Sequence, residues 1–125
     1  MKITPDEMSN LAITAHGIGW IEVNGLRHES SLLVTSSGAI EEIAISHIQA
    51  LALKDIRQLA DLPIEIALLG TGHHQHFIPP DLLTPLINGA IGFETMSTAA
   101  ACRTFNVLAS EGRKVGALLL LSSES

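Results

Sequence analysis

The side chains of this sequence that could do chemistry lie in its second half, in one glycine-rich turn and one helix-like segment. They are Gly70, Thr71, Gly72, Ser97, Thr98, Arg103 and Asn106. Arginine offers a planar set of N–H donors and asparagine an amide, so both suit an anion or a peptide carbonyl group. Ser97 or Thr98 would begin a helix whose free N–H groups attract anions. An exposed polar helix face is the competing interpretation of Arg103 and Asn106, and helical-wheel geometry alone favours it.

The glycine-rich turn at residues 70–72 follows the apolar run 64–69, which we expect to be a buried strand. In open α/β sheets, ligands bind beyond the carboxyl ends of strands, and glycine lets a ligand or backbone approach closely. The turn is not a dinucleotide fingerprint, because position 75 is Gln, and no Gly-Lys-Ser/Thr follows to make a P-loop. It predicts a ligand or partner site, with a plain tight turn as the alternative.

Histidines crowd the loop that follows, at His73, His74 and His76. If the loop is extended, His74 and His76 share a face and could chelate a metal ion. Zinc normally requires three protein ligands, and no spacing dictates the third. A solvated loop is the simpler interpretation, so we assign no metal site.

Cys102 is the single cysteine of the chain. A helix N-terminus lowers a thiol pKa, which would suit a nucleophile. However, Cys102 borders the apolar face of its segment, where a free cysteine behaves as a small hydrophobe, and the sequence places no base beside it. We therefore assign no catalytic residue and no cofactor, and the sequence holds no complete catalytic constellation.

The composition describes a small acidic domain with an aliphatic core. The chain has 125 residues, of which 46% are hydrophobic and 3% aromatic, and its formal net charge is -6. This length fits a single domain over residues 1–125. The negative charge disfavours nucleic acid and anionic membrane surfaces as partners. No apolar run reaches the length of a membrane-spanning helix, and residues 1–7 lack a signal core, so we expect no membrane insertion and a cytoplasmic protein.

Two kinds of pattern divide the chain. Residues 11–45 read as short strands, and Asn24-Gly25 predicts a hairpin turn between two of them. Helical spacing then runs from Ser46, as a cap, to the Leu62-Pro63 pair. Strands at 64–69, 91–95 and 115–121 alternate with helices at 81–88, ended by Gly89, and 98–111. Helical crossovers between strands predict an α/β fold with partly parallel pairing.

Three segments together resemble one family: Gly70-Thr71-Gly72, residues 98–108, and Glu111-Gly112-Arg113. The hairpin region from Ile18 to Val34 is similar as well. The family is the small-domain family that includes a mitochondrial respiratory complex I assembly factor and an adipogenesis-associated protein. Gly70, Thr71, Gly72, Thr98, Arg103, Asn106, Glu111 and Arg113 match its recurring pattern, whereas Phe105 stands where many members have tyrosine.

The resemblance implies a three-layer α/β fold with a central mixed sheet and a β-hairpin extension. It implies no established enzyme activity, and the members that are understood act as assembly partners. Our leading hypothesis is therefore a non-enzymatic binding or assembly module with a protein partner. The alternative is a small-molecule or anion-binding protein, or an unrecognised enzyme, with a cleft near Gly70–Gly72, Arg103 and Asn106.

Overall fold

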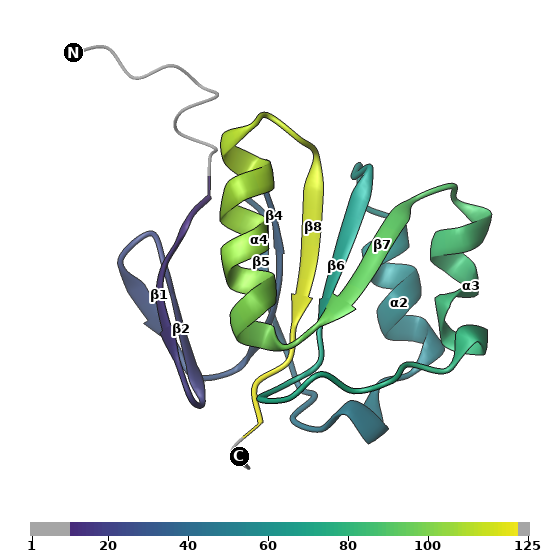
Figure 1. The fold of residues 1–125 in the computed structure, drawn as a ribbon, viewed down its shortest axis with the longest axis horizontal. Coiled ribbons are helices and arrows are strands. Elements are labelled where there is room, and N and C mark those ends of the chain that lie inside the picture. Colours follow the sequence, from purple (N-terminus) through teal and green to yellow (C-terminus); the bar gives the residue numbers. More distant parts are fainter. Residues whose placement is uncertain (1–10, 123–125) are drawn as a thin grey trace.

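The computed structural model describes residues 11–122 of the chain. The amino-terminal residues 1–7, in which no signal core was found, lie outside this range. Within it, the strands form two sheets, one of three strands and one of five (Figure 1). Among residues 11–122, no helix is long and apolar enough to cross a membrane.

The smaller sheet is the predicted hairpin region. Its antiparallel strands are β1 (Ile13–Gly17), β2 (Trp20–Val23) and β3 (Leu26–His28). Asn24 and Gly25 connect β2 to β3 with φ angles of 49° and 86°. Both residues are thus in the left-handed region that a two-residue hairpin turn requires, and the predicted turn is confirmed.

The larger sheet is mixed, with strand order β5-β4-β8-β6-β7. Its strands are β4 (Ser31–Thr35), β5 (Ile40–Ile43), β6 (Ile66–Gly70), β7 (Gly92–Met96) and β8 (Val115–Leu119). β4 pairs antiparallel with β5 and β8, whereas β6 pairs parallel with β7 and β8. The prediction of partly parallel pairing is therefore correct. Because β6, β7 and β8 are parallel, their carboxyl ends lie at the same end of the sheet.

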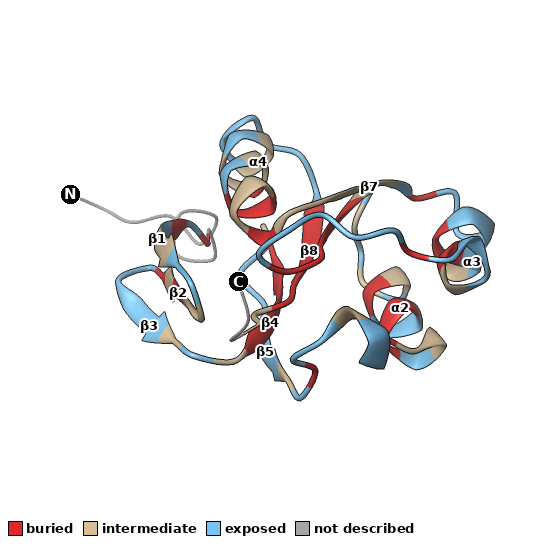
Figure 2. Ribbon diagram, turned by 60° about the horizontal axis from the view of Figure 1, so that its bottom comes forward, coloured by how far each residue is buried: buried red, intermediate tan, exposed pale blue. Residues whose placement is uncertain are grey.

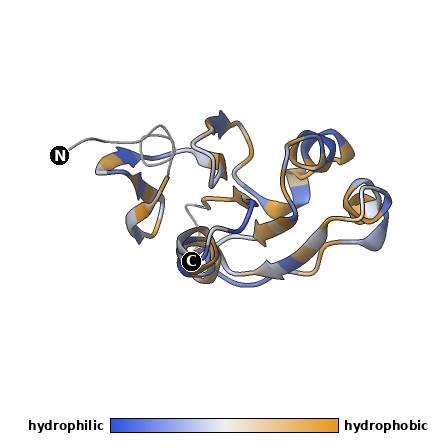
Figure 3. Ribbon diagram, turned by 90° about the horizontal axis from the view of Figure 1, so that it is seen from above, coloured by the Kyte–Doolittle hydropathy of each residue, from blue (hydrophilic) through white to orange (hydrophobic). Residues whose placement is uncertain are grey.

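Helices cover both faces of the larger sheet, which makes the predicted three layers. α4 (Thr98–Ser110) lies on one face beside the hairpin sheet, and α2 (Leu53–Ala60) and α3 (Pro80–Asn88) lie on the other (Figures 1 and 2). Buried residues accordingly form two clusters, one containing Phe105 of α4 and one containing Leu86 of α3. Viewed from above, apolar segments recur in both helices and strands (Figure 3).

One sequence prediction about helix ends is wrong, and another is confirmed with a different cap geometry. The helical pattern from Ser46 is broken into a short 3-10 turn, η1 (Ile48–Ala50), and α2. Ser46 therefore caps neither element, and instead the carboxylate of Asp55 accepts a bond from the Ala52 N–H at 2.9 Å. α3 ends at Gly89 as predicted, but Gly89 itself has φ of -83°, and the left-handed residue is Ala90, with φ of 56°.

Candidate functional site

The carboxyl ends of β6 and β8 are fastened to the start of α4 by hydrogen bonds, and we call this the strand-end junction (residues 70–72, Thr98 and Leu120). The Thr98 hydroxyl donates to the Leu120 carbonyl at 2.6 Å and accepts from the Gly72 N–H at 2.9 Å. The Thr98 N–H donates to the Gly72 carbonyl at 2.8 Å, and Leu120 N–H donates to Gly70 at 3.0 Å. The polar groups of the predicted motif are thus largely used inside the protein.

The structure explains why residues 70 and 72 of the junction are glycines. A Cβ on Gly70 would lie 3.0 Å from the Thr98 Cα, so the close approach of α4 to β6 requires glycine there. Gly72 has φ of 115°, a conformation that L side chains rarely adopt. The Gly-Thr-Gly turn was predicted as a ligand or partner site, and its glycines are explained without any ligand.

Thr71 shapes the loop that leaves the junction. Its side chain is buried, and its hydroxyl accepts from the His76 N–H at 2.9 Å. The same oxygen lies 3.1 Å from the His74 carbonyl and 3.2 Å from that of Met96. Because one hydroxyl fixes both the loop and the end of β7, the exposed residues 73–77 hold a defined position at the sheet edge.

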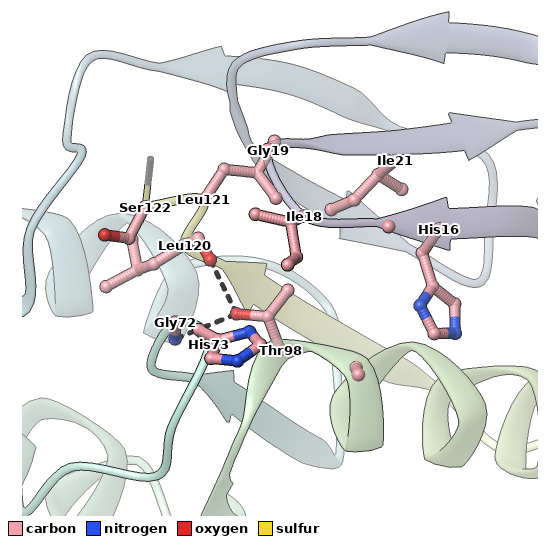
Figure 4. Close-up of a pocket in the computed structure, with 12 residues that line it drawn as sticks. His16, Ile18, Gly19, Ile21, Gly72, His73, Thr98, Leu120, Leu121 and Ser122 are labelled. Atoms are coloured by element: carbon pink, nitrogen blue, oxygen red, sulfur yellow. Dashed lines mark hydrogen bonds between the residues drawn. The ribbon is translucent and has the colours of Figure 1, made fainter. Parts of the chain in front are cut away.

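Three cavities follow this loop, and together we call them the carboxyl-edge groove. The first, of about 160 Å³, lies between the hairpin sheet and the junction, with Ile18 and His16 on one side and His73 and Thr98 on the other (Figure 4). The second, of about 150 Å³, shares Gly72 and His73 with the first. The third, of about 300 Å³, shares His76 with the second. Shared lining residues make the cavities neighbours along one path.

The groove combines polar groups with exposed apolar side chains. Its described lining residues include five histidines and no Asp, Glu, Lys or Arg. Ile18, in the first cavity, is 61% exposed, and Phe77, in the third, is 80% exposed. Ile18 and Phe77 thus add exposed apolar area beside the first and third cavities.

The histidines are not arranged as a metal centre. Among residues 11–122, no group of three or more His, Cys, Asp or Glu side chains could hold a metal ion. The His73 and His74 rings contact each other edge-on, with centroids 4.6 Å apart. The structure therefore does not support the metal-binding hypothesis for the 73–76 loop.

Arg103 and Asn106 lie apart from the groove, so the predicted convergence with the Gly-Thr-Gly turn does not occur. Asn106 donates from Nδ2 to the Ile13 carbonyl at 2.7 Å and accepts from the Ile13 N–H at 2.9 Å. It thereby fastens β1 to α4. Arg103 is exposed and lines none of the three cavities. Ser97 is the predicted helix cap, and its Oγ accepts from the Ala100 N–H at 3.3 Å.

Cys102 is fully buried in the core between α4 and the sheets. Desolvation raises the pKa of its thiol to about 12, and the nearby charge of Arg103 lowers it only slightly in comparison. The thiol is therefore protonated at neutral pH, which removes the thiolate that a nucleophile needs.

Arg113, which matches the family pattern, also has a structural partner. Its Nε donates to Glu65 Oε1 at 2.7 Å, and this bond lowers the pKa of that carboxyl group. The pair joins the segment before β6 to the turn before β8. Sequence reasoning missed the groove residues Ile18 and Phe77, and the available signal was the apolar Phe77 directly after the polar run at residues 73–76.

Comparison with known proteins places the chain in one family. A model described as "Protein of unknown function (DUF498/DUF598)" matches residues 13–120. An uncharacterized protein of Rhodobacter capsulatus is 36% identical over 110 residues, covering 88% of this chain and 84% of that protein. A Bordetella parapertussis crystal structure superimposes with a TM-score of 0.85 at 33% identity, covering 91% of this chain and 98% of that one.

The similarity to an assembly factor is more limited. The mouse NADH dehydrogenase [ubiquinone] 1 alpha subcomplex assembly factor 3 is 40% identical over 57 residues, or 46% of this chain. The matched part spans 31% of the length of that assembly factor. The family model, in contrast, covers the fold from β1 to the end of β8, and the chain belongs to the DUF498/DUF598 family.

Proposed function

We propose that this protein is an assembly-type binding module whose carboxyl-edge groove holds a segment of a partner protein. The observation that carries the proposal is the row of three neighbouring cavities along residues 72–79, with Ile18 exposed at one end and Phe77 at the other. A row of shallow hollows suits an elongated segment better than one compact small molecule.

The chemistry of the groove indicates what kind of segment it holds. The chain has a net charge of -6, yet the described lining of the groove carries no carboxylate and no Lys or Arg. An apolar segment with neutral polar side chains would avoid burying an unpaired charge there. Histidine and backbone groups would supply hydrogen bonds, and Ile18 and Phe77 would supply apolar contact area.

The partial similarity to a respiratory complex assembly factor supports the same conclusion. That relative is named for assembly, and the similarity to it extends over 57 residues of this chain. An assembly factor acts by binding other proteins, so a groove for a protein segment agrees with the relative's name. A protein partner and a cytoplasmic setting are part of this proposal for the present chain.

Site-specific photocrosslinking in the native host tests the proposal. A photoreactive phenylalanine analogue replaces Phe77 in one variant and Val107 in the control. Both positions carry exposed apolar side chains, at 80% and 55% exposure, but Val107 lies on α4 outside the groove. We expect discrete protein adducts from position 77 only, and mass spectrometry should locate the crosslink in a mainly apolar segment of the partner.

Equal adducts from positions 77 and 107 would contradict the proposal, because they would indicate contact without a preferred surface. Adducts that form at neither position while the protein is folded would contradict it as well. Small-molecule adducts at position 77 without any protein would support a ligand-binding role instead.

A further inference from the structure

The five-stranded sheet has two edge strands, and they differ in how well they are protected. β5 carries two consecutive glutamates. Gln58 donates a hydrogen bond to the Glu41 carboxylate, and the Glu42 Oε2 lies 3.8 Å from the His28 Nδ1. Charged side chains on an edge strand discourage the addition of another strand. β7, at the other edge, has the sequence Gly-Phe-Glu-Thr-Met with the single charge of Glu94. β7 is therefore the more open edge.

The backbone of β7 offers unused hydrogen-bonding groups. The Met96 carbonyl accepts from the Thr71 N–H at 2.9 Å, so Met96 and, by alternation, Glu94 direct their backbone groups toward β6. In a parallel ladder the intervening residues direct theirs to the other side. Phe93 and Thr95 thus point N–H and C=O outward, to the side on which β7 has no neighbouring strand in the five-stranded sheet.

A hollow runs along this same edge. It has a volume of about 320 Å³ and is lined by Phe77, Ile78, Leu83, Phe93, Glu94 and Thr95. Because three consecutive strand residues line it, the hollow follows the backbone of β7. It shares Phe77 and Ile78 with the third cavity of the carboxyl-edge groove. A segment that leaves the groove at Phe77 would therefore arrive at the open edge.

We propose that β7 takes up an extended segment of a partner protein as an added strand, with a lysine or arginine opposite Glu94. The inference rests on the proposed function and names the form in which the partner binds. The outward groups of Phe93 and Thr95 would supply main-chain hydrogen bonds. The exposed Glu94 carboxylate would select a basic residue on its own face, since opposite charges directly across strands stabilise pairing.

The charge on β7 argues against a second copy of this chain as the occupant. Antiparallel pairing of β7 with itself over its full length would centre on Glu94. The two carboxylates would then face each other in the closest kind of cross-strand pair, which is destabilising. A heterologous basic segment avoids this repulsion.

The test uses the full chain and a capped synthetic peptide, Val-Thr-Val-Lys-Val-Thr-Val. Its valines would lie on the Phe93 face and its lysine opposite Glu94. One control peptide has Glu in place of Lys, and another carries N-methyl groups on the two central valines flanking the lysine. Amide NMR spectra and hydrogen exchange are followed during titration. We expect exchange at Phe93 and Thr95 to slow by about tenfold or more, and the Glu peptide to bind about three- to tenfold more weakly.

Two chain variants make the test specific for this edge. Glu94→Lys should reverse the preference between the Lys and Glu peptides, whereas Glu41→Lys on β5 should leave it unchanged. The N-methylated peptide should not protect the β7 amides, because methylation removes the N–H donors that face the strand.

Three outcomes would overturn the inference. The first is an unchanged hydrogen-exchange rate of the Phe93 and Thr95 amides at saturating peptide. The second is equal protection of these amides by the N-methylated and unmethylated peptides. The third is protection of the β7 amides by rising protein concentration alone. The last result would identify a second copy as the occupant. Any of these results, combined with specific crosslinking from position 77, would leave the proposed function intact while removing the strand-addition form of it.

Discussion

The strand-end junction and the carboxyl-edge groove are neighbours in the chain but differ in almost every physical respect. In the junction, Thr71 and Thr98 are buried and hydrogen-bonded within the protein, and Gly70 permits close packing. In the groove, His73 and Phe77 are exposed, and their side chains line hollows. Residues that form a recognisable motif thus hold the strand ends together, whereas the less conspicuous loop beside them carries the exposed side chains that we propose contact a partner.

The largest predicted effect is on the junction. Gly70→Val places a branched side chain 3.0 Å from the Thr98 Cα and forces α4 away from β6. We expect the free energy of unfolding to fall by about 3 kcal/mol, as measured by urea denaturation. Gly92→Val is the matched control, because a Cβ on Gly92 would lie 3.8 Å from its nearest neighbour. Similar losses for both glycines would contradict the structural account of the junction.

The next effect concerns the Thr98 hydroxyl. Thr98→Val leaves the buried Gly72 N–H and Leu120 carbonyl without this partner, so stability should fall by about 2 kcal/mol. Thr98→Ser keeps the hydroxyl and should recover at least half of the loss. If Thr98→Ser is as unstable as Thr98→Val, methyl packing rather than hydrogen bonding holds the junction.

A smaller effect separates Asn106 from Arg103, two polar residues of one helix. Asn106→Ala removes both hydrogen bonds to Ile13 and should cost about 1–2 kcal/mol, with faster exchange of the Ile13 amide. Arg103→Ala, at an exposed position, should change stability by less than about 0.5 kcal/mol. Equal losses of stability in the two variants would mean that the Asn106 hydrogen bonds do not hold the hairpin sheet against α4.

The smallest effect at neutral pH is expected from the ionisation of Cys102, which changes stability only in alkali. Its pKa in the folded protein, about 12, exceeds the ordinary thiol value of 9.0 because burial disfavours the thiolate. Below pH 9.0 the thiol is protonated in both states and its contribution to stability is fully present. Between pH 9.0 and 12 the unfolded chain loses the proton first, so stability should fall.

Comparison of the pH profiles of wild type and Cys102→Ala checks this, with iodoacetamide labelling of the native protein at pH 8 as a second readout. The variant should lose the part of the alkaline decline that comes from the thiol. Rapid labelling of native Cys102 would show that the thiol is accessible and contradict its place in the core.

Sequence patterns predicted the local features of the fold well. The Asn24-Gly25 turn and the Ser97 cap depend on residues close together in the chain, and both are as expected. The interruption between η1 and α2 was missed, because an apolar spacing of helical period does not show where the backbone leaves the helix.

The candidate site was predictable only in part, because it is assembled from distant segments. Ile18 comes from the hairpin, His47 from the segment before η1, and His73 from the loop after β6. Asn106 was expected at a ligand surface, but its partner Ile13 lies 93 residues away in the sequence. No local period contains such contacts, so they required the tertiary structure.

The most direct test of the account is a charge introduced into the groove without harm to the fold. Ile18→Glu and Ile87→Glu alter two isoleucines of similar exposure, 61% and 56%, but only Ile18 lines the groove. Partner adducts from the photoreactive position 77 are then quantified in each background. The account predicts that Ile18→Glu abolishes these adducts while Ile87→Glu leaves them unchanged, with both variants within about 0.5 kcal/mol of the wild-type stability. Undiminished adducts in Ile18→Glu, or equal loss in both variants, would contradict it.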